Sequence, residues 1–397
     1  MIVEVGVYNV TPLFLFDAMG YTILTMMIKQ KQQLFYYLYK YIAKPVFFRI
    51  DPEVTHDIVL HVGRFLGKFL VLQKITTAFF GYKNTKLRQN LFGVIFPNPV
   101  GLAAGFDKNA QLMSILPAVG FGFEEVGSVT AKPCVGNPKP RLWRLKKSQS
   151  LLVYYGLKND GSLVIEDRLK RTPFRFPVGL SIAKTNSKDT VVVENGVADY
   201  LASYRRLASY SDYVAINISC PNSFGGLAFT KPDFLDALLV EVEKESIKKP
   251  VFLKLSPDLT EEVIDGILAV CEKYTIAGFI CGNLTKVRNN QKIKDAVPSQ
   301  NGGLSGKVVS DLSNTCIRYI YKKTKGRYVI IGCGGITSGA DAYEKIKSGA
   351  SLVQLITGMI FEGPQVIGQI NRELVELLQK DGYANISEAI GVSVKYD

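Results

Sequence analysis

Eight short apolar runs recur along the chain from Pro99 onward, separated by stretches with helical spacing. The runs are PVGLAAG (99–105), FEEVGSV (123–129), VGLSIAK (178–184), YVAINIS (213–219), VFLKLS (251–256), AGFICGN (277–283), YVIIGCGG (328–335) and LVQLIT (352–357). Alternating strand and helix patterns are typical of a parallel sheet whose strands are joined by crossover helices. Since eight such units close a barrel, the sequence predicts the α/β class, a (β/α)8 TIM barrel with an N-terminal amphipathic helical extension.

Each apolar run ends in small or polar residues. These are Gly105 and Lys108, Ser128, Lys184, Asn217 to Asn222, Lys254, Asn283, Gly334 and Gly335, and Thr357. In such barrels the active site lies at the carboxyl ends of the strands, so these residues are predicted to share one face. The stretch from about Pro133 to Pro177 is a long connection that we expect to cover that face, and no second domain is predicted.

The first 26 residues form a largely apolar segment that Asp17 and Gly20 interrupt. As a membrane span this segment is marginal. No Lys or Arg precedes it, so it is a poor match to a secretion signal or a mitochondrial presequence.

Residues 27–75 combine basic and aromatic side chains with helical spacing, and residues 76–397 are assigned to the barrel. One helical pattern is predicted to be limited by Pro45, and a second follows Pro52. Amphipathic helices with basic flanks are typical of an interfacial membrane anchor, and the alternative is a helical pair packed on the barrel as ordinary core.

The formal charge is +13, from 48 Lys and Arg against 35 Asp and Glu. Such an excess suits an anionic membrane, nucleic acid or small anionic substrates, or it is simply solvated at the surface. No nucleic-acid motif accompanies it, so no nucleic-acid partner is expected. The six cysteines include no C-x-x-C pair and the chain has only two histidines, so no metal site is expected.

Two glycine-containing turns follow the last two predicted strands. GGITSG (334–339) comes after the seventh strand, and Thr357-Gly358 comes after the eighth. Glycine lets backbone N–H groups approach an anion closely, and TIM barrels commonly hold a phosphate at this place. The pair of turns therefore predicts a phosphorylated cofactor.

Lys254 ends the fifth predicted strand and is expected to point toward the open end of the barrel. A lysine there is costly unless it meets negative charge. The electron-rich edge of a reduced flavin would supply that charge, and the alternative is a salt bridge to a neighbouring acid.

Cys220 stands between Asn217 and Asn222 at the end of the fourth strand, on a turn stiffened by Pro221. A free thiol has a pKa of about 8.5, so a modest shift makes it a usable general base. The asparagines can hold the amide-like edges of a planar ring by paired hydrogen bonds. Inert packing is the alternative for the cysteine.

Six segments together resemble the dihydroorotate dehydrogenases, over about Ile50 to Gly391. They are AAGFDK (103–108), GFGFEEVGSVT (120–130), GNPKPRLWR (136–144), SCPN (219–222), GGLSGK (302–307) and GASLVQL (349–355). The front helices and the DPExxH stretch that ends at His56 resemble the quinone-dependent, membrane-associated branch. The resemblance implies oxidation of (S)-dihydroorotate to orotate in UMP biosynthesis, with FMN as hydride acceptor and a quinone as final acceptor. It also implies a peripheral location on the cytoplasmic membrane, or on the mitochondrial inner membrane in a eukaryote.

The resemblance also assigns roles to single residues, with Cys220 as the catalytic base. FMN would be bound by Ala103, Ala104, Gly105, Lys108, Gly127, Ser128, Ser181, Asn217, Lys254 and Ile356, with Ser305, Gly306, Gly334, Gly335 and Thr357 around its ribityl phosphate. The substrate would be bound by Lys108, Asn217, Asn222 and Asn283. His56 and Arg144 would contact the quinone.

Four positions depart from the family pattern. Cys220 replaces the serine usual in the quinone-dependent branch, and Ser181 and Leu284 replace an asparagine and a hydroxyl residue. Val153 stands where an asparagine is usual, so one ring contact is lost or Asn159 supplies it. Two alternatives follow: a related flavin barrel that uses reduced nicotinamide and acts on another pyrimidine or on uridine in RNA, and a non-catalytic binding barrel.

Overall fold

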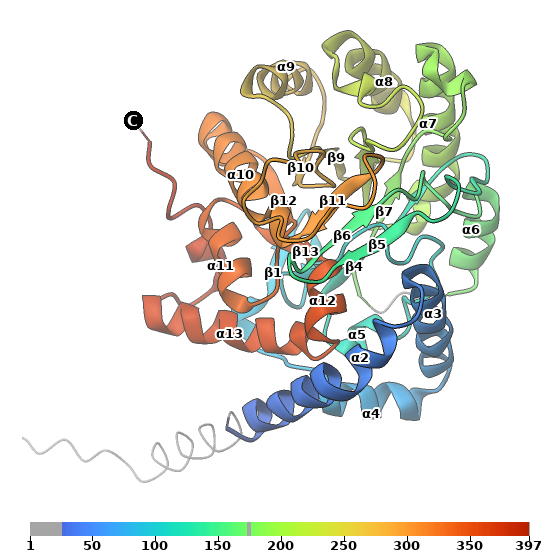
Figure 1. The fold of residues 1–397 in the computed structure, drawn as a ribbon. Coiled ribbons are helices and arrows are strands. Elements are labelled where there is room, and N and C mark those ends of the chain that lie inside the picture. Colours follow the sequence, from blue (N-terminus) through green and yellow to red (C-terminus); the bar gives the residue numbers. More distant parts are fainter. Residues whose placement is uncertain (1–25, 173–175, 397) are drawn as a thin grey trace, which may run out of the picture.

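The computed structural model describes residues 26–172 and 176–396, and within them eight parallel strands close into a barrel (Figure 1). The predicted segment 1–26 lies outside the described residues except for Met26. The strands, in their order around the barrel, are β3 (Val100–Leu102), β4 (Phe123–Val129), β7 (Val178–Ile182), β8 (Tyr213–Asn217), β9 (Val251–Leu255), β10 (Gly278–Cys281), β12 (Val329–Cys333) and β13 (Leu352–Leu355). Each of the eight predicted runs contains one of these strands, so the predicted fold class is confirmed.

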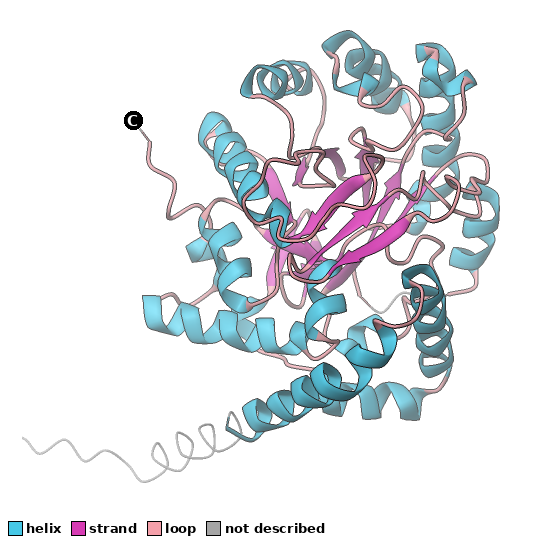
Figure 2. Cartoon of the chain, viewed as in Figure 1, coloured by secondary structure: helices cyan, strands magenta, loops and turns pink. Residues whose placement is uncertain are grey.

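Helices surround the barrel (Figure 2). They are α5 (Leu116–Val119), α6 (Ser162–Lys170), α7 (Val193–Leu207), α8 (Pro232–Lys244), α9 (Glu261–Cys271), α10 (Ser310–Thr324), α11 (Gly339–Lys347), α12 (Thr357–Glu362) and α13 (Val366–Asp381). Strand residues such as Leu180 and Leu253 are fully buried and join helix residues such as Leu238 in one hydrophobic cluster. Parallel strands covered on both faces require such nearly continuous apolar runs.

The amino end of the barrel is closed by apolar side chains. Phe123, Tyr213 and Phe252 from the strands pack with Phe96 of a hairpin formed by β1 (Gln89–Leu91) and β2 (Val94–Phe96). The polar chemistry is therefore left to the opposite, carboxyl end.

A three-stranded antiparallel sheet, here the cover sheet, stands outside the barrel. It consists of β5 (Leu142–Leu145), β6 (Ser150–Val153) and β11 (Gly303–Gly306). The first two strands lie within the long connection predicted as a cover, and the third belongs to the GGLSGK segment after β10. The predicted connection thus supplies two of the three strands of this sheet, and the third strand comes from a distant part of the chain.

The N-terminal region is helical over residues 26–38, a π-helical turn (Tyr39–Ala43), α2 (Lys44–Phe47), α3 (Pro52–Lys68) and α4 (Leu70–Phe80). The prediction that Pro45 limits the first helix is wrong, because the helical path continues to Phe47. Pro45 stands in the first turn of α2, where its missing N–H costs little. The second predicted helix is divided at Phe69, whose backbone is extended, and the helical region ends at Phe80, beyond the predicted boundary at residue 75.

The N-terminal helices have one packed face and one exposed face. Phe35 packs edge-on against Phe79 and Phe80, and the Tyr39 hydroxyl donates a hydrogen bond to Ile360 O at 2.6 Å. The opposite face exposes large apolar side chains: Met26, Met27, Leu34, Leu38, Tyr41, Ile42, Val46, Val54, Ile58, Val62, Phe65, Phe69, Leu70, Val71 and Ile75. Among the described residues, no helix is both long and apolar enough to cross a membrane.

Candidate active site

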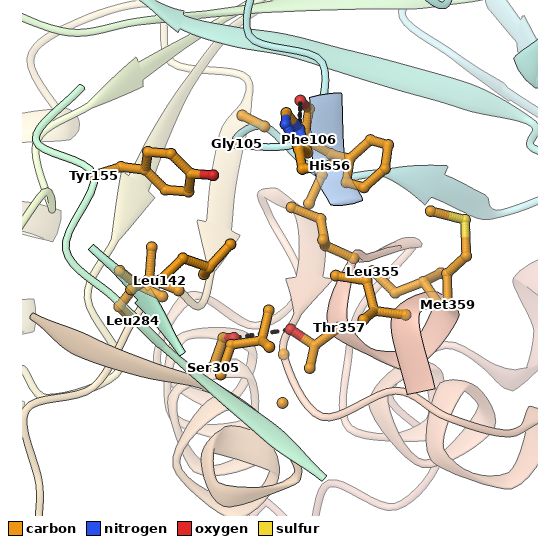
Figure 3. Close-up of a pocket in the computed structure, with 18 of the residues that line it drawn as sticks. His56, Gly105, Phe106, Leu142, Tyr155, Leu284, Ser305, Leu355, Thr357 and Met359 are labelled. Carbon is orange, nitrogen blue, oxygen red and sulfur yellow. Dashed lines mark hydrogen bonds between the residues drawn. The ribbon is translucent and has the colours of Figure 1, made fainter. Parts of the chain in front are cut away.

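A cavity of about 530 Å³ opens at the carboxyl ends of the strands (Figure 3). The cover sheet contributes Leu142 and Val153 to its wall, and the N-terminal helices contribute Tyr39 and His56. This volume is typical of a site for a small molecule or cofactor. The cavity therefore lies where the strand-end residues were predicted to meet.

All but one of the predicted site residues line this cavity. They are His56, Ala103, Ala104, Gly105, Lys108, Gly127, Ser128, Arg144, Asn217, Cys220, Asn222, Lys254, Asn283, Ser305, Gly306, Gly334, Gly335, Ile356 and Thr357. Ser181 does not: it is fully buried behind the wall, with its hydroxyl 2.8 Å from that of Ser128. Ser181 therefore acts on the cavity only through Ser128.

Glycines form a tight cradle at one end of the cavity. Gly306 has φ +87°, and a Cβ added there would lie 2.5 Å from Gln149 O. Gly335 has φ +77°, and its Cβ would lie 2.2 Å from the Cβ of Ser310. Beside them the hydroxyls of Ser305 and Thr357 are 2.8 Å apart (Figure 3). Closely approaching backbone with hydroxyl donors suits a phosphate group.

Lys254 forms a buried ion pair. Its Nζ lies 2.9 Å from Oε1 of Glu125, and both side chains are almost fully buried. Oε2 of Glu125 also accepts hydrogen bonds from Gln354 at 2.9 Å and from Tyr213 at 3.4 Å. Burial alone would lower the pKa of Lys254, but the Glu125 carboxylate outweighs it and raises that pKa. The salt bridge that stood as the alternative is present, and Lys254 lines the cavity as well.

Lys108 is a partly buried cation, and no carboxylate among the described residues is in hydrogen-bond contact with it. Its Nζ lies 4.2 Å from the centre of the Tyr155 ring. Burial lowers the pKa of Lys108 to about 8, and the positive charge of Lys158 acts in the same direction. The buried Tyr155 hydroxyl has no hydrogen-bond partner among the described residues. This part of the cavity is prepared for an anionic, hydrogen-bonding ligand.

The amide of Asn222 is oriented by the cover sheet. Its Nδ2 donates to Val153 O at 2.9 Å, and its buried Oδ1 has no partner among the described residues. Asn222 thus presents an acceptor, although the side chain of Val153 itself is apolar. Asn159 does not supply the missing contact: its amide is used in the turn around Thr130 and Gly161, and it does not line the cavity.

Asn217 and Asn283 are held by short polar contacts. Asn217 Nδ2 donates to Ser128 Oγ at 2.8 Å, and Asn283 Nδ2 donates to Ser219 Oγ at 2.8 Å. The side chain of Asn283 also accepts a hydrogen bond from Leu284 N at 2.9 Å. Both amides are therefore fixed before any ligand arrives.

Cys220 lies in the loop of residues 218–227 after β8, here the Cys220 loop, and its side chain lines the cavity. Burial raises the pKa of the thiol. Hydrogen bonds from the Asn222 backbone and from Ser223 oppose this effect, as do the charges of Lys184 and Lys286. The pKa shift toward a usable base that the sequence suggested thus runs in the opposite direction in the structure.

His56 and Arg144 line the cavity on the side of the N-terminal helices. Nε2 of His56 is 2.8 Å from Phe106 O, so it carries the proton that this hydrogen bond requires. Burial and then the charge of Lys108 lower the pKa of His56 to about 4, so the ring is neutral at physiological pH. Arg144 is fixed by hydrogen bonds to Ile50 O and Thr55 Oγ1.

Sequence reasoning missed several lining residues. Tyr39, Tyr155 and Met359 come from separate parts of the chain and have no local motif that would identify them, whereas Leu142 lies within the GNPKPRLWR segment but was given no role. Glu125 did leave a signal, since an acid within the apolar run FEEVGSV must find a buried partner.

Comparison with known proteins gives consistent results. The family model described as "Dihydroorotate dehydrogenase" matches residues 86–378. The "Dihydroorotate dehydrogenase (quinone)" of Natronomonas pharaonis is 40% identical over 353 residues, which are 89% of this chain and 99% of that protein. The protein of the same name from Trichodesmium erythraeum is 36% identical over 378 residues, 90% of this chain and 99% of that protein.

Solved structures agree with these matches. The ligand-free type DHODH from Eimeria tenella has a TM-score of 0.78 at 32% identity, covering 87% of this chain and 100% of that chain. The Eimeria tenella DHODH in complex with ferulenol has a TM-score of 0.75 at 32% identity, covering 86% of this chain and 95% of that chain.

Proposed function

Because the chain belongs to the dihydroorotate dehydrogenase family, we propose that it oxidises (S)-dihydroorotate to orotate, in UMP biosynthesis, and passes the electrons to a quinone. The main support among the residues is the shape of the site. A single cavity joins the glycine cradle, Lys108, Cys220 and the N-terminal helices that carry His56. Both halves of the reaction therefore have a place in one continuous site.

FMN is the cofactor that fits this cavity. The cradle at Gly306 and Gly335 admits no side chain, and the hydroxyls of Ser305 and Thr357 stand beside it. These residues would hold the phosphate, with the remaining predicted cofactor residues along the flavin. When bound, FMN supplies the acceptor for the hydride that leaves C6 of the substrate.

The substrate would be oriented by charge and by fixed amides. Lys108 would bind the carboxylate, which would also favour the charged form of this lysine. The free Oδ1 of Asn222 would accept a hydrogen bond from a ring N–H, and Asn217 and Asn283 would hold the other polar edges of the ring. Because the protein holds these amides in advance, little entropy is lost on binding.

Cys220 would act as the general base that removes the proton from C5. Its thiol lies in the cavity wall, and the reaction leaves the proton on sulfur and a C5–C6 double bond in the product. The raised pKa of Cys220 makes the thiolate the minor form at neutral pH, so the rate of oxidation should rise on the alkaline side.

Quinone would enter on the side of the N-terminal helices, beside His56 and Arg144. The apolar face that these helices expose is suited to lie in the boundary of a bilayer, with the basic residues from Lys29 to Arg49 near anionic head groups. A peripheral membrane location follows, on the cytoplasmic membrane or on the mitochondrial inner membrane in a eukaryote. Residues 27–80 would then be the membrane-associating, quinone-binding part, and the rest of the described chain the FMN-binding barrel.

An anaerobic visible spectrum of the purified protein tests this function. Dihydroorotate should bleach the flavin band, and a quinone analogue should restore it where fumarate and NAD do not. A yellow protein that dihydroorotate cannot bleach would contradict the proposed substrate. The apolar side chains of Val153 and Leu284 in the cavity wall would then direct the search to another pyrimidine.

A further inference from the structure

Lys184 is a buried cation behind the Cys220 loop. It follows β7, and only 4% of the residue is exposed. Its Nζ donates to Phe224 O at 2.7 Å and to Thr190 Oγ1 at 3.3 Å. Phe224 belongs to the Cys220 loop, so a charged group is tied directly to the segment that carries the thiol.

Asn186, two residues further along, contacts the same part of that loop. Its Oδ1 accepts a hydrogen bond from Phe224 N at 2.9 Å, and its Nδ2 donates to Gly156 O at 3.2 Å. Phe224 is therefore held at both its N–H and its C=O by the segment after β7. One of the two contacts carries charge and the other does not.

Lys184 and Cys220 also line a common small cavity. A cavity of about 10 Å³ lies between Lys184, Cys220, Ser223, Tyr200 and Phe229. Such a space has room for about one water molecule, so little solvent lies between the two residues there. A charge acts more strongly across such a gap than across bulk water.

The charged and titratable groups around the pair are few. Asp199, on α7, accepts a hydrogen bond from Thr185 N at 2.8 Å, and Tyr200, on the same helix, donates to Asn217 O at 2.9 Å. Cys134, before the cover sheet, acts on Lys184, and Lys286, after β10, acts on Cys220. Burial lowers the pKa of Lys184. Among the charges that oppose this effect and raise the pKa, a thiolate at Cys220 has the largest influence.

We propose that Lys184 is a positioning residue for Cys220. The ammonium of Lys184 stabilises the Cys220 thiolate, and its hydrogen bond to Phe224 O holds the Cys220 loop in place. The proposal rests on the proposed function in one respect, since the thiolate matters because Cys220 is the base. It explains how a partly buried thiol is able to take the place of the serine that is usual in the quinone-dependent branch. Without a nearby cation, burial would favour only the protonated form.

The test is the pH dependence of Cys220 alkylation in the holoenzyme without substrate. Iodoacetamide labelling is followed by peptide mass spectrometry, with Cys220→Ser as the blank for the signal. Lys184→Gln keeps a donor for Phe224 O but removes the charge, so the labelling midpoint should move up by about one pH unit, a roughly tenfold loss of thiolate below the midpoint. Lys184→Arg should restore the midpoint to near that of the wild type.

Asn186→Ala is the matched control, because it releases Phe224 N without changing any charge. It should slow flavin reduction and leave the labelling midpoint unchanged. A Lys184→Gln midpoint equal to the wild-type value would overturn the proposal, as would an equal shift in Asn186→Ala. If Lys184→Gln does not fold, the alkylation midpoint is measured in Lys184→Met, which keeps the aliphatic part of the side chain and removes the charge.

The labelling result is independent of the substrate. If dihydroorotate fails to bleach the wild-type flavin, the proposed function fails, whereas the midpoints of the Lys184 variants still decide the role of this lysine.

Discussion

The ammonium of Lys254 and the carboxylate of Glu125 meet at 2.9 Å inside the barrel, with almost no access to solvent. Lys254 lies in the wall of the cavity, whereas Glu125 lies behind it among the strands. Removing one partner of such a pair leaves the other charge buried and uncompensated.

Glu125→Gln should therefore lower the free energy of unfolding by about 3–5 kcal/mol and weaken FMN binding. Glu124→Gln on the same strand is the matched control. Burial, followed by the charge of Asp107, raises the pKa of Glu124 well above its usual range, which favours the neutral form of this side chain. Urea unfolding and the flavin absorbance of the purified variants measure both effects. Equal stabilities of the two variants would contradict a structural role for the ion pair.

Acid should weaken the contact that Glu53 of α3 makes with the residues flanking β5 and β6. Burial alone would raise the pKa of Glu53, but Arg141 at 2.7 Å and Lys158 at 3.0 Å outweigh it and lower that pKa to about 2. Because the folded-state pKa is depressed, the stabilisation is complete above the unfolded value of about 4.3 and is lost as the pH falls toward 2. The contribution is roughly 3 kcal/mol. The free energy of unfolding should differ less between pH 7 and pH 3 in Glu53→Gln than in the wild type. An equal difference in the two proteins would contradict this role of Glu53.

Cys220→Ala should slow flavin reduction by dihydroorotate by about 10²–10⁴-fold and leave reoxidation by quinone intact. Cys220→Ser should shift the pH dependence of reduction upward, because a hydroxyl loses its proton less readily than a thiol. Cys333→Ser is a suitable control, since this second thiol also lines the cavity but has no assigned role. Stopped-flow absorbance separates the two half-reactions. Rapid reduction of Cys220→Ala would end the assignment of the base.

His56→Ala should slow reoxidation by a quinone analogue without changing flavin reduction. Because the pKa of His56 is lowered to about 4, its charge should not alter the oxidative half-reaction between about pH 6 and pH 8. His61, the exposed second histidine, provides the control as His61→Ala. A pH midpoint near 6.5 that disappears in His56→Ala would show that the ring titrates normally.

The exposed apolar face predicts binding to lipid vesicles. Replacing Phe65 and Phe69 by Gln should weaken binding to anionic vesicles in a flotation assay, since each buried phenylalanine contributes about 1.5–3 kcal/mol. Phe92, on the β1–β2 hairpin outside these helices, is 51% exposed and gives the control Phe92→Gln. Equal losses in both variants would point to nonspecific adsorption.

The barrel was predictable because each strand is encoded locally, as an apolar run that ends in small or polar residues. The same pattern located the strand-end side chains, since parallel strands bring their carboxyl ends together. The helix was predicted to end at Pro45, but a π-helical turn before this proline leads the helical path on to Phe47. The second helix was predicted to be continuous, but the extended backbone of Phe69 divides it. Neither feature has a distinct sequence signal.

The rest of the site depends on contacts between distant segments. Nothing near Tyr39 indicates that its hydroxyl bonds to Ile360 O. Ser181 occupies a position at which the family pattern has a cofactor-contacting asparagine, yet it does not line the cavity and bonds to Ser128 instead.

The pairing of Val153 with Gly303 in the cover sheet also determines when during synthesis this sheet is completed. On the ribosome, the first two strands of this sheet emerge long before β11, the strand that completes it. The cavity therefore stays open through most of synthesis, and nascent chains that end before β11 should not retain the proposed FMN. Capture of the proposed cofactor would consequently be a late step of synthesis, after the N-terminal helices have left the ribosome.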